Sequence, residues 1–226
     1  MTIDLHSLID TPATNPAETP AEPLVELDKR NQMRKLMRKR RRALSPTQQA
    51  NAAHKLFRRA APSKLFRFSR RIAFSMARGG EINPELLLRE AQRRKKLCYL
   101  PVMSKLGGPR LHFRLFKKGH KLIRNNFGIL EPSRKATCKP FALSLVLMPL
   151  VAFDVECNRL GMGKGYYDRA FAFLHRSVRQ RPVLLGLAHE CQKADELEVA
   201  PWDVPLNAVV TDKAWYEGQS VRKQAS

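Results

Sequence analysis

The sequence predicts an α/β fold in which helices cover both faces of a mostly parallel central sheet, giving three layers (α/β/α). Short apolar segments alternate along the chain with amphipathic segments that carry the start signals of helices. The segment LSLVLMPLVAF at 143–153 is apolar throughout, as is typical of a strand buried on both faces. These observations indicate a single α/β domain, which we place at residues 29–226.

The first 28 residues differ in composition from the rest of the chain. They contain four prolines and six acidic residues but no lysine or arginine. This composition predicts that residues 1–28 are a largely disordered acidic tail. It lacks the basic and apolar regions of a secretory signal and the arginines of a mitochondrial presequence.

Two amphipathic helices are predicted to follow the tail. Nine of the fourteen residues at 29–42 are Lys or Arg, and Met33, Leu36 and Met37 recur at helical spacing. A second helix is predicted to start at Ser45, because Ser-Pro-Thr-Gln supplies an N-cap, a proline in the first turn and a capping-box glutamine.

The remaining elements alternate between strand and helix. Besides the buried segment, the apolar pattern predicts strands at 71–76, 97–103, 110–116, 182–188 and 207–211. Helices are predicted at 83–96, with Asn83 as the cap, and at 166–178, where apolar residues form one stripe.

The chain is strongly basic, with a formal net charge of +22. Such a surface attracts nucleic acid, acidic membranes, or small ligands rich in phosphate and carboxylate. The apolar runs fall short of the roughly 20 residues of a membrane span, which argues against a membrane protein. The four cysteines are scattered without a C-x-x-C pair, which predicts reduced thiols in a cytoplasmic protein.

The most specific stretch of the sequence is NRLGMGKGYYDR at 158–169. Its glycines would let backbone N–H groups approach an anion, Lys164 adds a positive charge, and Asp168 can hold Mg²⁺ against phosphate oxygens. Neither familiar phosphate-loop template fits. Asn158 stands in place of the first P-loop glycine, and Tyr166 in place of the last glycine of the dinucleotide fingerprint. From the residues alone, the loop either binds phosphate or is a turn made for tight packing.

Together with the strand before it, this loop resembles the signature of the 5-formyltetrahydrofolate cyclo-ligase family. The family pattern is a hydrophobic strand ending in P-x-x-A-F-D, followed by R-L-G-x-G-x-G-Y-Y-D-R, and residues 145–169 read LVLMPLVAFDVECNRLGMGKGYYDR. Other segments are similar to family motifs in the same order: RNQMRKLMRKRRRALS, GGEINPELL, NFGILEP, GLAHECQ and APWDVPLNAVVTD. The resemblance covers almost the whole chain after the tail.

The resemblance implies a three-layer α/β/α fold and a specific reaction. Members of this family use ATP and Mg²⁺ to convert 5-formyltetrahydrofolate (folinate) into 5,10-methenyltetrahydrofolate, with release of ADP and phosphate. The formyl oxygen takes the γ-phosphoryl group to give an N5-iminium phosphate, and N10 then closes the ring as phosphate leaves. Such a reaction requires two ligands held in line and charge stabilisation at the phosphates, without a nucleophilic triad.

Carried over position by position, the resemblance assigns two groups of site residues. The ATP side comprises Arg30, Arg34, Arg159, Gly161, Met162, Gly163, Lys164, Gly165, Tyr166, Tyr167 and Asp168. The folate side comprises Met76, Glu81, Tyr166 and Tyr167. A carboxylate at Glu81 suits the N–H groups of a pterin. Lys164, Tyr166 and Asp168 are expected to take part in the reaction, with Asp168 as the Mg²⁺ ligand.

Three of these assignments leave alternatives. The family more often has lysine at the position of Arg30, so Lys29 is a second candidate there. Tyr167 fits the site and equally the buried stripe of its helix. Asn207 stands where many family members have aspartate, which leaves a second metal ligand unassigned.

A basic RNA-binding protein on the same fold, or RNA binding as a second activity, is the main alternative to an enzyme alone. The basic residues at 29–42 suit an RNA backbone. However, the sequence lacks an RNP-like aromatic motif, and ATP and folates are themselves strongly anionic. We expect the partners to be these two small molecules, with nucleic-acid contact limited to the first helix, no membrane contact, and a monomeric protein.

Overall fold

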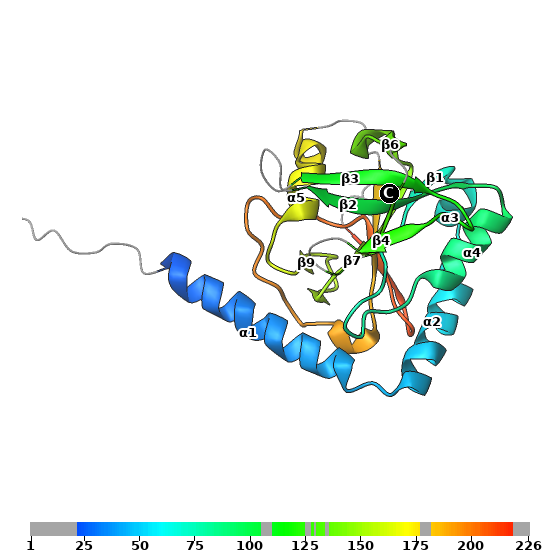
Figure 1. Ribbon diagram of the computed structural model, residues 1–226. Helices are drawn as coiled ribbons and strands as arrows, with labels where there is room; N and C mark the ends of the chain where they lie inside the picture. Colours follow the sequence, from blue (N-terminus) through cyan, green and yellow to red (C-terminus); the bar gives the residue numbers. More distant parts are fainter. Residues whose placement is uncertain are drawn as a thin grey trace, which may run out of the picture.

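An eight-stranded sheet forms the centre of the protein (Figure 1). The computed structural model describes residues 22–104, 110–124, 128, 130–133, 136–176 and 182–218. From one edge to the other, the strands are β12 (Trp215–Glu217), β11 (Ala208–Val210), β10 (Val183–Leu187), β7 (Leu145–Pro149), β1 (Arg71–Ala73), β2 (Leu97–Ser104), β3 (Arg110–Phe116) and β6 (Thr137–Cys138). The strands from β11 to β2 run parallel, and β12, β3 and β6 are antiparallel to their neighbours.

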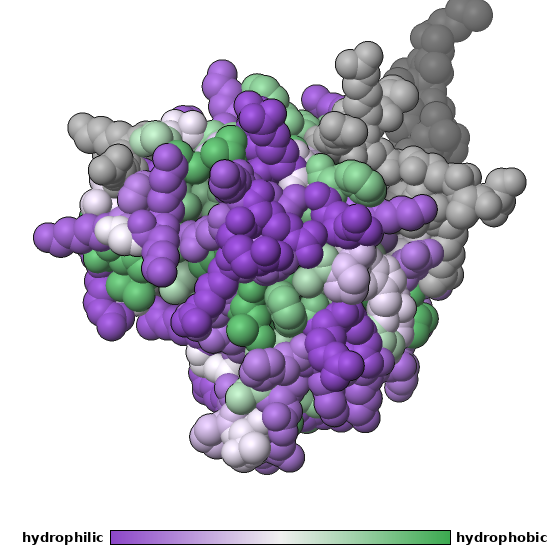
Figure 2. Space-filling model, turned by 90° about the vertical axis from the view of Figure 1, so that its right-hand side faces the viewer, coloured by the Kyte–Doolittle hydropathy of each residue, from purple (hydrophilic) through white to green (hydrophobic). Residues whose placement is uncertain are grey.

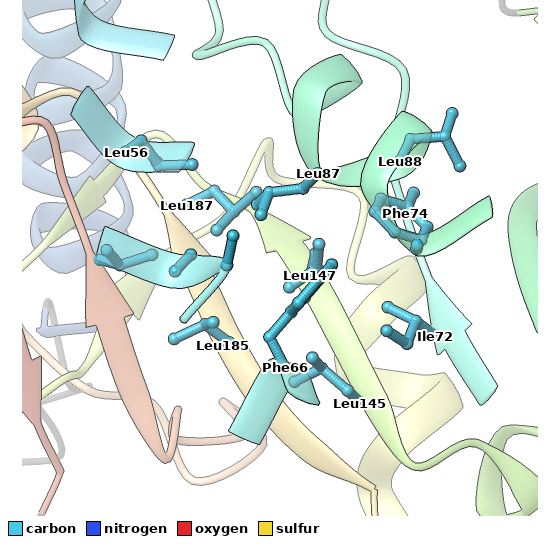
Figure 3. Close-up of a cluster of buried hydrophobic side chains, with 14 of the residues drawn as sticks. Leu56, Phe66, Ile72, Phe74, Leu87, Leu88, Leu145, Leu147, Leu185 and Leu187 are labelled. Carbon is cyan, nitrogen blue, oxygen red and sulfur yellow. The ribbon is translucent and has the colours of Figure 1, made fainter. Parts of the chain in front are cut away.

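Both faces of the sheet are covered, which confirms the predicted three-layer α/β fold. Alternate residues of β7 point to opposite faces, because side chains alternate along a strand. Leu145 and Leu147 belong to the cluster under α2 (Pro46–Ala60), α3 (Lys64–Phe68) and α4 (Glu85–Arg93), part of which Figure 3 shows. Val146 and Met148 belong to the cluster on the other face, with residues of α5 (Tyr166–Phe171).

Helix α1 (Glu22–Arg42) lies along one end of the sheet and leads into α2 (Figure 1). It contacts the short 3₁₀ helix Glu190–Gln192 and strand β8 (Ala152–Phe153), and its Met37 is buried there. The helix starts at Glu22 and therefore includes residues 22–28 of the segment predicted to be the tail. The rest of the predicted tail, residues 1–21, lies outside the described residues.

Several predicted elements are shorter than expected. The apolar run at 143–153 is divided into β7 and β8, because Pro149 has no backbone N–H with which to continue the ladder. The strand predicted at 71–76 ends at Ala73, where the chain leaves the sheet, and α5 ends at Phe171 and continues as the 3₁₀ turn Ala172–His175. The capping box at Ser45 is formed as predicted.

Two small hairpins were not predicted. The first pairs β4 (Leu122–Arg124) with β5 (Leu130–Pro132) beside the central sheet. The second pairs β8 with β9 (Arg159–Leu160) and positions the glycine-rich loop that follows it. Hydrophilic residues predominate on the face shown in Figure 2. Within the described residues, no helix is long and apolar enough to cross a membrane.

Candidate active site

A cleft of about 1040 Å³ opens beyond the carboxyl ends of β1 and β7. In the sheet, β2 lies on one side of β1, whereas β7 and β10 lie on its other side. The cleft is therefore at the point where the strand order reverses, which is where open parallel sheets bind ligands. Ser75, Met76 and Pro149, which end or follow these strands, line it. Every site residue predicted from the family resemblance lines this one cleft as well.

The glycine-rich loop forms one wall of the cleft. It connects β9 to α5, and its backbone has φ values of +94° at Gly163 and +59° at Gly165. Other residues rarely adopt such angles, so glycine is needed at both places. A side chain on Gly163 would also lie 3.6 Å from the guanidinium carbon of Arg34, which shows how closely α1 approaches the loop. Lys164 is exposed at the tip of this wall.

Arg34 and Arg30 of α1 border the same wall. Arg34 is buried, and its Nε donates to the carbonyl of Gly161 at 2.9 Å. Burial lowers the pKa of Arg34, and the nearby charges of Arg30 and Arg38 lower it further. Arg30 pairs with Asp203 at 2.8 Å and lines the cleft.

Arg30 and its neighbour Lys29, the two candidates for one basic position of the site, differ in where they lie. Among the two, Arg30 reaches the cleft. Lys29 is exposed and pairs with Glu198 at 3.3 Å. The geometry therefore favours Arg30 as the first basic residue of the helix to face a ligand.

Asp168, in the first turn of α5, is held by Arg159. The Arg159 guanidinium donates from Nη2 to Asp168 Oδ1, and the backbone N–H of Val204 points at the same oxygen from 3.4 Å. Arg159 is buried in this pair and also lines the cleft. Its positive charge is therefore offset by Asp168. No group of three or more His, Cys, Asp or Glu residues that could hold a metal occurs within the described residues.

The opposite wall carries the predicted folate-side residues Met76 and Glu81. Burial raises the pKa of Glu81, and the opposing charge of Arg41 lowers it. Arg41 Nη2 lies 3.7 Å from Glu81 Oε1, and the backbone N–H of Arg78 donates to Oε2 at 3.2 Å.

The two tyrosines of the signature serve both the cleft and the core. Tyr166 is buried under the guanidinium of Arg169, which lies 5.7 Å from its ring centroid. The ring of Tyr167 stacks on Phe171 with centroids 6.4 Å apart. Burial and the charge of Glu81 raise the pKa of Tyr167, so its hydroxyl stays protonated. The two interpretations of Tyr167 are therefore compatible.

Asn207 does not line the cleft. Its Oδ1 accepts from the backbone N–H of Leu184 at 2.7 Å, and its own N–H donates to the carbonyl of Leu184. These bonds tie the start of β11 to β10. The second metal ligand stays unassigned.

Sequence reasoning missed several residues of the site. Trp202 and Asp203 line the cleft near Arg30, and Arg41 contacts Glu81 from behind. An apolar strip that includes Met103 and Leu130 also lines it. For Arg41 a signal existed, because it lies seven residues after Arg34 and so on the same helix face.

A family model described as the 5-formyltetrahydrofolate cyclo-ligase family matches residues 26–212. The chain belongs to this family. The predicted family and the predicted enzyme class are confirmed by this match and by curated relatives that carry the cyclo-ligase name. The roles assigned to individual residues stay predictions.

Relatives of this cyclo-ligase family member are similar over most of their length. The 5-formyltetrahydrofolate cyclo-ligase of Escherichia coli (strain K12) is 34% identical over 183 residues, which cover 80% of this chain and 99% of that protein. The Haemophilus influenzae protein of the same name is 34% identical over 180 residues, or 79% and 95% of the two chains. Among solved structures, 5,10-methenyltetrahydrofolate synthetase from Aquifex aeolicus aligns with a TM-score of 0.73 at 27% identity, covering 84% of this chain and 93% of that one.

Proposed function

We propose that this cyclo-ligase family member converts 5-formyltetrahydrofolate into 5,10-methenyltetrahydrofolate, using ATP and Mg²⁺ and releasing ADP and phosphate. The observation that carries the proposal is that one cleft holds the glycine-rich loop on one wall and Glu81 on the other. Seven Lys or Arg and three Asp or Glu residues line it. Such an excess of positive charge suits two anionic ligands that meet in one space.

In this proposal the two ligands occupy opposite walls. The ATP phosphates bind the backbone of the glycine-rich loop and the charges of Arg34 and Lys164. The Glu81 carboxylate accepts hydrogen bonds from the pterin N–H groups of folinate. Met103 and Leu130 offer apolar surface to its aromatic part.

The proposed reaction has two steps. The formyl oxygen attacks the γ-phosphorus, an O–P bond forms, and the bond to the β-phosphate oxygen breaks with its electron pair on ADP. N10 then attacks the activated carbon and loses its proton, and the C–O bond breaks as phosphate leaves. Arg34 and Lys164 offset the charge that spreads over the phosphoryl oxygens, and the protonated hydroxyl of Tyr167 can donate a hydrogen bond near the reacting carbon.

Asp168 is the residue that would hold Mg²⁺. It lines the cleft directly after the glycine-rich loop, and a single carboxylate suits an ion that takes most of its ligands from nucleotide phosphates and water. When bound, the ion would neutralise charge on the β- and γ-phosphates. Arg159 fixes the position of Asp168 Oδ1.

Turnover of the purified protein tests the proposed function. Folinate, ATP and Mg²⁺ together should produce the ultraviolet absorbance of methenyltetrahydrofolate, and omission of ATP should abolish it. A protein that binds RNA tightly but forms no such product would overturn the proposal in favour of the RNA-binding alternative. Size-exclusion chromatography in the same buffer tests the expected monomer.

A further inference from the structure

Arg41, in the last turn of α1, is among the most deeply buried side chains of the described residues, with 2% of its surface exposed. Its Nε donates to the carbonyl of Gly79 at 3.0 Å, and Nη1 donates to the carbonyl of Leu150 at 3.3 Å. Its Nη2 lies 3.7 Å from the Glu81 carboxylate. All of these contacts except the one to Leu150 are made to the turn that carries Glu81.

The position of Arg41 on its helix links the two walls of the cleft. Arg34 and Arg41 are seven residues apart and therefore lie on one face, about 10 Å apart along the helix axis. Arg34 bonds Gly161 at the start of the glycine-rich loop, and Arg41 bonds the turn of the opposite wall. One rigid helix thus sets the distance between both walls.

We propose that Arg41 is a positioning residue that holds the Glu81 carboxylate, and the turn 79–81, in the place where folinate binds. Arg41 does not line the cleft itself, so it acts through Glu81. The inference rests on the proposed function, because Glu81 is the residue that would meet the pterin. His189 supports the same turn, since its Nε2 lies 3.2 Å from the carbonyl of Gly80.

The charges around Glu81 make the role of Arg41 measurable. Burial raises the pKa of Glu81, whereas Arg41, then Arg78 and Arg38, lower it. Tyr167 faces Glu81 from α5. On the α2 and α4 side, a smaller cavity lined by Glu81 also contains His54, Glu85 and Arg89.

Loss of the Arg41 charge would therefore raise the pKa of Glu81 further. A carboxylate accepts pterin N–H groups in its ionised form. Folinate binding is then lost as the pH falls through this pKa. In an Arg41→Gln variant the loss is expected at a higher pH than in the wild type.

Ligand binding to Arg41→Gln tests the proposal. Titration calorimetry of the full chain with folinate alone should show affinity weaker by about tenfold or more, whereas affinity for Mg-ATP alone should change less than about twofold. Lys39→Gln removes the same charge from an exposed position of the same helix turn and should leave both affinities unchanged. Equal losses for both ligands, or an unchanged folinate affinity, would refute a role that acts through Glu81.

A double-mutant cycle with Glu81→Gln separates positioning from general destabilisation. If Arg41 acts through Glu81, then Arg41→Gln should weaken folinate binding little when Glu81 is already replaced. Additive losses of affinity would contradict the proposal. So would an Arg41→Gln variant that loses folinate binding at the same low pH as the wild type. Should Arg41→Gln fail to fold, Arg41→Lys replaces the guanidinium that bonds Gly79 and Leu150 but keeps the charge. The same cycle then applies, whereas the pH dependence of folinate binding should stay at its wild-type position. Because binding is measured without turnover, a wild type that binds folinate but forms no product refutes the proposed function and not this inference.

Discussion

At the scale of single residues, the buried pair of Arg159 and Asp168 connects stability with the proposed chemistry. The side chains are only 3% and 14% exposed, so neither charge is well solvated without the other. Removing one partner of such a pair leaves an uncompensated buried charge, which is costly. The effect of a substitution at Asp168 thus depends on whether Arg159 keeps an acceptor.

We predict that Asp168→Ala lowers the free energy of unfolding by about 3 kcal/mol, whereas Asp168→Asn lowers it by about 1 kcal/mol, because the amide oxygen still accepts from Arg159. Both variants should lose about 100-fold or more in kcat, since the carboxylate charge is absent in each. Urea unfolding and the turnover assay measure the two effects.

Glu85→Ala, which removes an exposed pair with Arg89, serves as the control and should change stability by less than about 1 kcal/mol. Near-normal turnover of Asp168→Asn would show that the charge is not needed.

A second residue-scale prediction concerns the backbone of the glycine-rich loop. Gly163→Ala forces a side chain into a positive φ of +94°, which should cost about 1–2 kcal/mol of stability and raise the KM for ATP about tenfold. Gly119→Ala is a matched control, because its φ is +82° and an added Cβ would meet nothing within 4 Å. It should lose similar stability with an unchanged KM. If both variants leave the KM unchanged, the loop does not hold the nucleotide.

The site residues predicted from sequence lie in or near the segments that resemble family motifs, because a motif fixes residue type and spacing together. Arg41 was not predicted, since it is one of nine basic residues between 29 and 42 and composition does not show which of them is buried. Asn207 was given a hypothetical link to metal, and its backbone bonds to β10 became visible only in three dimensions.

At the scale of elements, an explicit start signal predicted the beginning of α2, whereas the apolar pattern did not predict the end of α5. The N-terminus of α2 follows from Ser45 and Gln48, whose side chains and backbones bond reciprocally at 3.2 and 2.8 Å. By contrast, the end of α5 at Phe171 has no glycine or proline signal in the sequence. The short strands β4, β5 and β12 were missed for a similar reason, since three residues are too few for a periodic pattern.

The capping box predicts the stability effect of a change at Ser45. Ser45→Ala removes the acceptor for the Gln48 backbone N–H and should lower the free energy of unfolding by about 1 kcal/mol. Ser45→Asp keeps an acceptor and should stay within about 0.5 kcal/mol of the wild type. Chemical denaturation measures both, and the KM for either substrate should not change, because Ser45 does not line the cleft. Equal stability of the Ala variant would mean that the cap does not form in solution.

At the scale of the whole molecule, the fold class and the position of the cleft were predictable because they depend on patterns longer than any one element. Alternation of strands and helices predicts a parallel sheet, and a parallel sheet binds ligands beyond its strand ends. The strand order was not predictable in this way. It depends on which strands pair across long separations, such as β1 with β7, and no local pattern encodes that choice.

The net charge of +22 leads to a prediction about the molecule as a whole. Because basic residues outnumber acidic ones both overall and in the cleft, the field should draw anionic substrates toward the site, and salt should screen it. Raising NaCl from about 0.05 M to about 0.5 M should increase the KM for ATP and for folinate several-fold while kcat changes less than about twofold. Initial rates at a fixed ratio of Mg²⁺ to ATP measure this, with the non-coordinating zwitterion betaine at equal osmolality as the control. A KM that does not respond to salt would mean that the charge serves something other than substrate capture. Titration of the same protein with RNA over the same salt range would then show whether RNA binding depends on this charge.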